Sequence, residues 1–223
     1  MGALVALALV GAVIFSLSSG DSGPLGGIVG DDTPDTPEFA FETGKPKAVE
    51  TSTEPDHEQA VAAAQAPAEA VTQRIDDLYS TAFLDPGNWM DGDYDDVLDF
   101  FAGGASDAAE EQLDVLTAGP GAAEAFDTIR PMPSTLKVQV LLDPEGVPRA
   151  VEGSARFVAR GTGSAGQVTL VSKGQFVFEK DDGEWLVVSF SVQRNDEERE
   201  LKPSSSSSPG ASGSDEPSEA EAS

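Results

Sequence analysis

The sequence predicts an α+β domain in which N-terminal helices pack on a curved, four-stranded antiparallel sheet. The clearest sign is the stretch 173–194, where apolar and polar residues alternate on both sides of Asp182-Gly183, a pair that suits a tight hairpin turn. A second alternating run covers residues 136–142, and apolar side chains recur at helical spacing over 71–83. A sheet with one apolar face needs a cover, which the upstream helices supply.

The composition excludes several classes of function. The chain has 223 residues, with 40 acidic and 13 basic side chains and a net charge of −27, so it repels nucleic acid. It has no cysteine, which excludes disulfides, thiolate zinc sites and a cysteine nucleophile. The helical half, residues 58–129, holds 16 acids and one base. Such a surface is typical of a solvated face; a surface for a basic partner or for divalent cations is the alternative.

The first 17 residues, MGALVALALVGAVIFSL, carry no charge and are membrane-directed. Their length lies near the lower limit of about 17 residues for a spanning helix, so they fit a transmembrane signal-anchor or the apolar part of a signal peptide. We favour the retained anchor, because the Ala-x-Ala cleavage pattern is absent. No base precedes the segment and the next one is Lys45, so loop charges do not set the orientation.

The remaining chain divides into a linker, a domain and a tail. Residues 18–65 are acidic and rich in Gly, Pro, Ser and Thr, which predicts a disordered linker in which Phe39 and Phe41 are isolated aromatics. Residues 66–200 hold the apolar patterns of one α+β domain. Residues 201–223 are serine-rich and acidic, and we expect a disordered tail.

Within the domain, a first helix is expected over 67–84, ended by Asp85-Pro86-Gly87, with Asn88-Trp89-Met90 in a loop. A short helix over 94–102 and one capped by Ser106 follow, and 122–129 forms a last turn. The strands are 136–142, a second around 151–157, a third over 167–180 with a bulge or bend at 172–174, and the final strand of the hairpin.

The run LYSTAFLDPGNW (78–89) and the ending GEWLVVSFSVQR (183–194) resemble the nuclear transport factor 2-like cone fold of small actinobacterial envelope proteins, including mammalian-cell-entry-associated membrane proteins. The resemblance implies a cone lined by the helices and the sheet. Members of that fold include isomerases, dehydratases and polyketide cyclases, which place Asp, His or Tyr in the cone, and proteins that only bind or scaffold. The sole histidine, His57, lies in the expected linker, so the histidine-based dehydratase pattern does not transfer to this chain.

Few residues are candidates for a site, and none is assigned as catalytic. Asp76, Tyr79, Trp89 and Phe190 are the candidates for a pocket in the cone, and Asp76 or Asp77 is the base that an isomerase would need. A polar stripe on the outside of the first helix is the ordinary explanation for these carboxylates.

The other charged groups do not indicate a catalytic site or a metal site. The cations Arg156, Arg160 and Lys173 fall on the polar side of the strands, away from these carboxylates. Residues 91–96 resemble a calcium loop but lack its turn glycine and its final glutamate, so we expect no metal and no cofactor.

These observations predict a single-pass protein of the cell membrane with an extracytoplasmic domain. It is held by its N-terminal helix and binds or scaffolds an envelope component, without catalysis and without nucleic acid. The alternative is a small hydrophobic-pocket enzyme of the isomerase or dehydratase type that uses Asp76 or Asp77. Two or more convergent polar groups in an apolar cavity would favour the enzyme.

Overall fold

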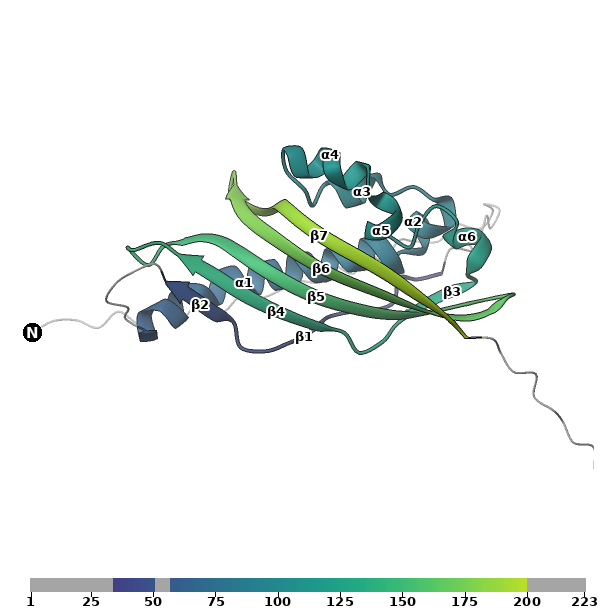
Figure 1. Cartoon of the computed structure of the whole chain (residues 1–223), viewed down its shortest axis with the longest axis horizontal. Helices are drawn as coiled ribbons and strands as arrows, with labels where there is room; N and C mark the ends of the chain where they lie inside the picture. Colours follow the sequence, from purple (N-terminus) through teal and green to yellow (C-terminus); the bar gives the residue numbers. More distant parts are fainter. Residues whose placement is uncertain (1–33, 51–56, 200–223) are drawn as a thin grey trace, which may run out of the picture. The chain divides into compact units, whose positions relative to one another are not determined.

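Three long antiparallel strands dominate the structure, a computed structural model that describes residues 34–50 and 57–199 (Figure 1). Strands β5 (Pro148–Gly163), β6 (Gly166–Asp181) and β7 (Glu184–Arg199) each have 16 residues, and β4 (Thr135–Leu142) pairs with β5. Their order is β4-β5-β6-β7, joined by short turns. The four strands expected from the alternating pattern are therefore present.

The predicted fold class is nevertheless wrong, because the sheet is mixed and has seven strands. Strand β3 (Thr128–Pro131) pairs antiparallel with β5, while β1 (Glu42–Thr43) and β2 (Lys47–Glu50) both run parallel to β4. The three extra strands have only two to four residues, which is too short for an alternating pattern to appear in the sequence. β1 and β2 cover the edge of β4, an edge that would otherwise be left unpaired.

One long helix, α1 (His57–Tyr79), crosses the sheet and lies behind it in Figure 1. It starts ten residues earlier than predicted, so His57 is an exposed residue at the helix start and not part of a linker. Its extra turns bury Ala60 and Ala64, which together with Ala68 continue the spacing of Val71 and Ile75. Alanine is a weak apolar signal, and for this reason the pattern did not show where the helix begins.

The chain between α1 and the sheet forms one π-helical segment and five short α-helices. These are η1 (Ser80–Leu84), α2 (Pro86–Asp91), α3 (Asp95–Leu98), α4 (Gly104–Glu110), α5 (Leu113–Leu116) and α6 (Ala122–Ala125). The loop expected at residues 88–90 is helical, because Asp85 caps α2 by accepting a 2.9 Å hydrogen bond from the Gly87 N–H. The cap expected at Ser106 is also wrong, since α4 begins at Gly104.

Residues 34–50, here called the N-terminal strap, pack on the domain and are not the linker that the sequence predicts for 18–65. Phe41 is only 6% exposed, its ring centroid lies 5.2 Å from that of Tyr79, and Phe39 lies 5.3 Å from Phe157 on β5. Phe157 also lies 4.9 Å from Phe83. The strap thus completes an aromatic cluster between α1 and the sheet, which its polar composition conceals.

Glycines and turns set the register of the long strands. The hairpin turn at Asp182-Gly183 is confirmed, with φ angles of 44° and 100°. The bulge expected at 172–174 is wrong, because β6 keeps its register there with both neighbours. Gly174 is required instead because the ring of Phe176 and the hydroxyl of Tyr79 cover it, and a Cβ would lie 2.9 Å from that hydroxyl.

The irregularity lies on β7, where the register shifts next to Phe178. Val187 consequently faces the core with no exposed surface, while Val188 is 36% exposed. Among the described residues, no helix is long and apolar enough to cross a membrane. The segments 1–17 and 201–223, for which we predicted an anchor and a tail, lie outside the described residues.

Candidate functional site

Asp76 and Tyr79 lie close together on α1, but both are engaged in packing. The Phe41 backbone N–H donates a 2.8 Å hydrogen bond to Asp76 Oδ1, so this carboxylate holds the N-terminal strap. Burial raises the pKa of Asp76, and the charge of Asp77 adds to the rise, while the bond from Phe41 opposes it. The Tyr79 hydroxyl lies 3.3 Å from Ser172 Oγ, and burial raises its pKa to about 12, so Tyr79 is neutral at physiological pH.

We expect Asp76→Asn to fold at least as stably as the native chain at neutral pH, and Asp76→Ala to lose about 1–3 kcal/mol. Asparagine keeps an oxygen for the Phe41 N–H and removes a charge that burial disfavours, whereas alanine leaves that donor unsatisfied. Because the folded pKa is raised, the stability contributed by Asp76 is fully present below its unfolded pKa of about 4 and is lost as the pH rises through the folded pKa. Urea unfolding between about pH 4 and pH 7 should therefore show a flatter pH dependence for Asp76→Asn. An unchanged profile would contradict this assignment.

The interior beside Tyr79 offers no room for a substrate. The gap there is lined by Leu78, Ala82, Phe176 and Val192 as well as Tyr79 and Ser172, and it does not admit a water molecule. A cavity enzyme needs a space that takes up its substrate next to a polar group. The pair Tyr79 and Ser172 is instead a buried, mutually satisfied polar contact between α1 and β6.

The other two predicted pocket residues lie elsewhere. Phe190 packs edge-on against Phe101 with ring centroids 5.1 Å apart. Trp89 is a buried residue of α2 and lines a hollow of about 400 Å³ together with Pro34 and Pro131. Its Nε1 has no hydrogen-bond partner among residues 34–50 and 57–199. The structure therefore brings Asp76 and Tyr79 together, but it does not join them with Trp89 and Phe190 in one pocket.

Two arginines, Arg194 on β7 and Arg74 on α1, are held by contacts within the fold. Arg194 on β7 donates to the carbonyl of Thr117 at 2.7 Å and to the carboxylate of Asp196, which ties α5 to the sheet edge. The Arg74 guanidinium lies 4.3 Å from the centre of the Phe100 ring. Neither cation is free to receive a ligand.

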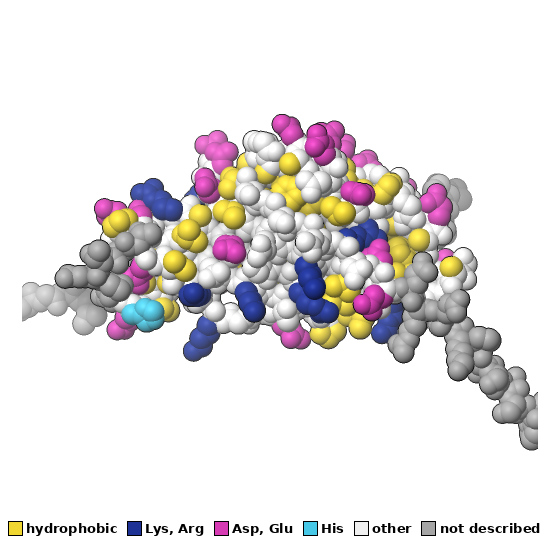
Figure 2. Space-filling view, viewed as in Figure 1, with side chains coloured by type: hydrophobic (Ala, Val, Ile, Leu, Met, Phe, Trp, Pro, Cys, Tyr) yellow, Lys and Arg dark blue, Asp and Glu magenta, His cyan; other side chains and the backbone are white. Residues whose placement is uncertain are grey.

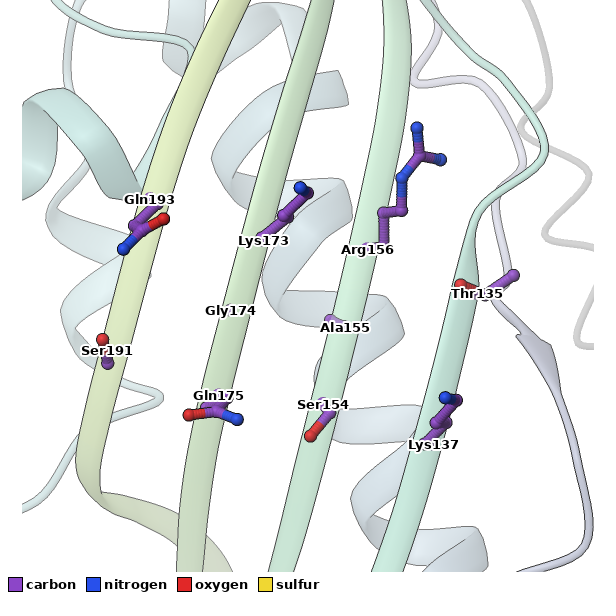
Figure 3. A pocket seen from close by; sticks show the side chains of 10 residues that line it. All are labelled: Thr135, Lys137, Ser154, Ala155, Arg156, Lys173, Gly174, Gln175, Ser191 and Gln193. Carbon is purple, nitrogen blue, oxygen red and sulfur yellow. The ribbon is translucent and has the colours of Figure 1, made fainter.

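A different site lies on the outer face of the sheet, defined here as the face of β4–β7 opposite α1 (Figure 3). Side chains from four neighbouring strands line a groove of about 420 Å³, here called the outer groove. Its polar residues form two adjacent cross-strand rows. The rows are Thr135, Arg156, Lys173 and Gln193, and Lys137, Ser154, Gln175 and Ser191.

The outer groove is a positive surface on a strongly negative protein. Lys137, Arg156 and Lys173 are exposed, and within the described part of the chain none of them has an ion pair or a hydrogen bond. No acidic residue lines the groove; Glu42 and Glu152 occupy neighbouring positions in the register. In the space-filling view, basic side chains gather over the sheet, while many acidic ones lie along the helices at the top (Figure 2).

The alternating pattern placed Arg156 and Lys173 on the polar side of the sheet, and this is confirmed. The sequence did not show that they meet Lys137, because the meeting depends on the pairing of β4, β5 and β6. Once the register is known, the groove can be recognised from the sequence, because three successive strands each carry a cation at an outward position.

The described residues form no metal centre. Within residues 34–50 and 57–199, no three His, Asp or Glu side chains are arranged to hold a metal ion. Asp95 and Asp96 lie in the first turn of α3, and Asp93 Oδ1 accepts a hydrogen bond from the Asp95 N–H at 3.1 Å. Residues 93–96 thus form an acidic helix start, while Asp91 ends α2.

The surface and the interior differ in what they offer a ligand. The interior beside Tyr79 is filled and the Tyr79 hydroxyl is paired with Ser172, whereas the outer groove is open and its cations are unpaired. No protein-family model, no curated protein and no solved structure matches this chain, so the outer groove is identified as the candidate site by its geometry alone.

Proposed function

We propose that this protein is a non-catalytic binding module whose ligand-binding surface is the outer groove. The observation that carries the proposal is the set of three unpaired cations, Lys137, Arg156 and Lys173, on one face of a chain with a net charge of −27. Cations that serve only solubility are dispersed or paired with acids on such a chain. A cluster whose cations have no ion-pair partner favours an anionic ligand.

The shape of the outer groove favours an extended, carboxylate-bearing segment. The two rows cross four strands spaced about 4.8 Å apart, which gives a length of about 14 Å. Four residues of an extended chain have the same length. The hydroxyl and amide groups of Ser154, Gln175 and Ser191 lie in the same cross-strand row as Lys137, next to the row of Arg156 and Lys173, and supply donors and acceptors for a backbone.

The contacts are exposed, so we expect weak and salt-dependent binding. An exposed ion pair contributes about 0.2–1 kcal/mol, and three of them contribute at most about 3 kcal/mol. Such a surface suits a protein that positions a partner. The apolar segment 1–17 and the resemblance to envelope proteins support the further proposal that the module is held at the cell membrane, on its extracytoplasmic side, where an acidic envelope protein is the partner.

The test is a titration of the full chain, in nanodiscs of neutral lipid, with a dye-labelled oligo-glutamate peptide followed by fluorescence anisotropy. We expect binding at low salt that weakens at physiological salt. The double variant Arg156→Glu, Lys173→Glu should weaken it at least about tenfold, because two attractions become repulsions.

Two matched variants serve as controls. Lys180→Glu reverses a charge on the opposite face of the same strand, and Tyr79→Phe removes the buried hydroxyl; both should bind like the native chain. Equal affinities for the double variant and Lys180→Glu would contradict the proposal, as would the absence of binding by every form of the chain.

A further inference from the structure

The outer groove continues toward the end of the described chain. A second depression of about 660 Å³ adjoins it, shares Arg156, Lys173 and Gln193 with it, and follows the edge of β7 as far as Glu197. Strand β7 ends two residues later, at Arg199. The last 24 residues of the chain therefore begin close to a depression that holds the cations Arg156, Lys173 and Arg194 and one acid, Glu197.

Those residues carry the charge that the outer groove lacks. After Lys202 there is no further base, and four acids follow at Asp215, Glu216, Glu219 and Glu221 within SDEPSEAEA, residues 214–222. We call residues 214–222 the acidic segment. Its four carboxylates are enough to neutralise the three cations Lys137, Arg156 and Lys173.

The acidic segment is also within reach of the outer groove. Gln193 lies six residues before Arg199, which corresponds to about 20 Å along the strand. Residues 200–213 span up to about 45 Å when extended. The connection is therefore more than long enough to return the acidic segment along β7 to the two rows of the groove.

We propose that the acidic segment of this chain occupies the outer groove and competes there with an acidic ligand. The inference rests on the proposed function, because both use the same three cations. Attachment to β7 gives the acidic segment an effective concentration of about millimolar, so even a weak contact is populated without any partner. A partner then binds only when it presents more negative charge, or a better fit, than the acidic segment.

The first experiment measures the competition. A tail-neutral variant carries Asp215→Asn, Glu216→Gln, Glu219→Gln and Glu221→Gln, and we expect it to bind dye-labelled oligo-glutamate up to about twofold more tightly than the native chain at low salt. The gain should vanish in the background of Arg156→Glu and Lys173→Glu.

The control for this experiment keeps the change in net charge and moves it away from the tail. It carries four glutamine substitutions at exposed helical acids, namely Glu58, Glu110, Glu111 and Glu124. A gain of the same size in this control would show that long-range charge, and not occupancy of the outer groove, sets the affinity, and would overturn the proposal.

The second experiment locates the acidic segment directly. The chain has no cysteine, so Ser218→Cys accepts a single nitroxide label. We expect the label to broaden the amide NMR signals of Lys173 and Gln175 but not that of Lys180, and the broadening to disappear at high salt and in the Arg156→Glu, Lys173→Glu variant. Broadening confined to other surfaces would overturn the proposal.

The two proposals fail in different ways. If the native chain and the tail-neutral variant bind oligo-glutamate equally, and charge reversal weakens both, the acidic segment does not occupy the outer groove while the proposed function stands. If neither form binds oligo-glutamate but the nitroxide still broadens Lys173 and Gln175, the outer groove serves only the chain itself and the proposed function fails.

Discussion

A chain that begins at residue 57, without the N-terminal strap, is expected not to fold cooperatively. The deletion removes β1 and β2 from the edge of β4 and takes Phe39 and Phe41 out of the aromatic cluster. Loss of one buried phenylalanine side chain costs about 3–5 kcal/mol, and a domain of this size has about 5–15 kcal/mol in total. Circular dichroism and differential scanning calorimetry should show no cooperative transition, whereas a chain that begins at Pro34 should unfold like the full chain.

The single substitution Phe41→Ala isolates the largest part of this effect. We expect it to lower the free energy of unfolding by about 3 kcal/mol, and Phe41→Leu to lower it by less than about 1.5 kcal/mol because most of the volume is retained. A cooperative, fully stable fragment over residues 66–200 would show instead that the strap is dispensable.

Gly174→Val is expected to destabilise the domain by about 3 kcal/mol or more, since it forces a branched side chain into filled space. The added atoms would meet the ring of Phe176 and the hydroxyl of Tyr79, side chains that are both buried and cannot move to solvent. Urea unfolding of Gly174→Val is compared with that of Gly44→Ala, where nothing lies within 4 Å of the added Cβ and the change should stay within about 0.5 kcal/mol.

A second substitution checks that the clash causes the loss. Phe176→Leu vacates part of the space over Gly174, so the double variant should lose less stability than the sum of the two single variants. Strict additivity would show that Gly174 is required for another reason.

The long strands were predictable because their signal is local. Phe176 and Phe178 alternate with Gln175, Val177 and Glu179, and Asp182-Gly183 adopts the positive φ angles that the pair was expected to provide. The parity of the return strand was predicted wrongly at its start, because the alternation of Leu186, Val188, Phe190 and Val192 favours Val188 for the apolar face. A register shift of one residue places Val187, and not Val188, in the core.

The packing of the strap could not be predicted from the sequence, because it depends on contacts with residues that are distant along the chain. Phe39 and Phe41 stand among Pro, Thr and Glu, a composition typical of linkers, and only the proximity of Tyr79 and Phe157 shows what they pack against. The same holds for Asp76. Its position next to the buried Ile75 left its direction open, and the hydrogen bond from the Phe41 N–H settles it.

The candidate site was predictable only in part. The alternating pattern assigned Arg156 and Lys173 to the solvent side of the strands, but it could not show which strand is the neighbour of which. The pairing of Arg156 with both Thr135 and Lys173 turns three separate surface cations into one cluster. Trp89 and Phe190 were chosen for their aromatic rings, a property that core residues and ligand-contacting residues share.

The pairing of the strap with β4 also has a consequence for the order in which the chain folds. The turns between β5, β6 and β7 bring sequence neighbours together, so these hairpins close early and at low entropic cost. Glu42, in contrast, pairs with Thr135, which is distant in sequence, so this contact forms only after the intervening chain has become compact. The strap is therefore expected to dock after the transition state, so weakening its contacts speeds unfolding and leaves the rate of folding almost unchanged.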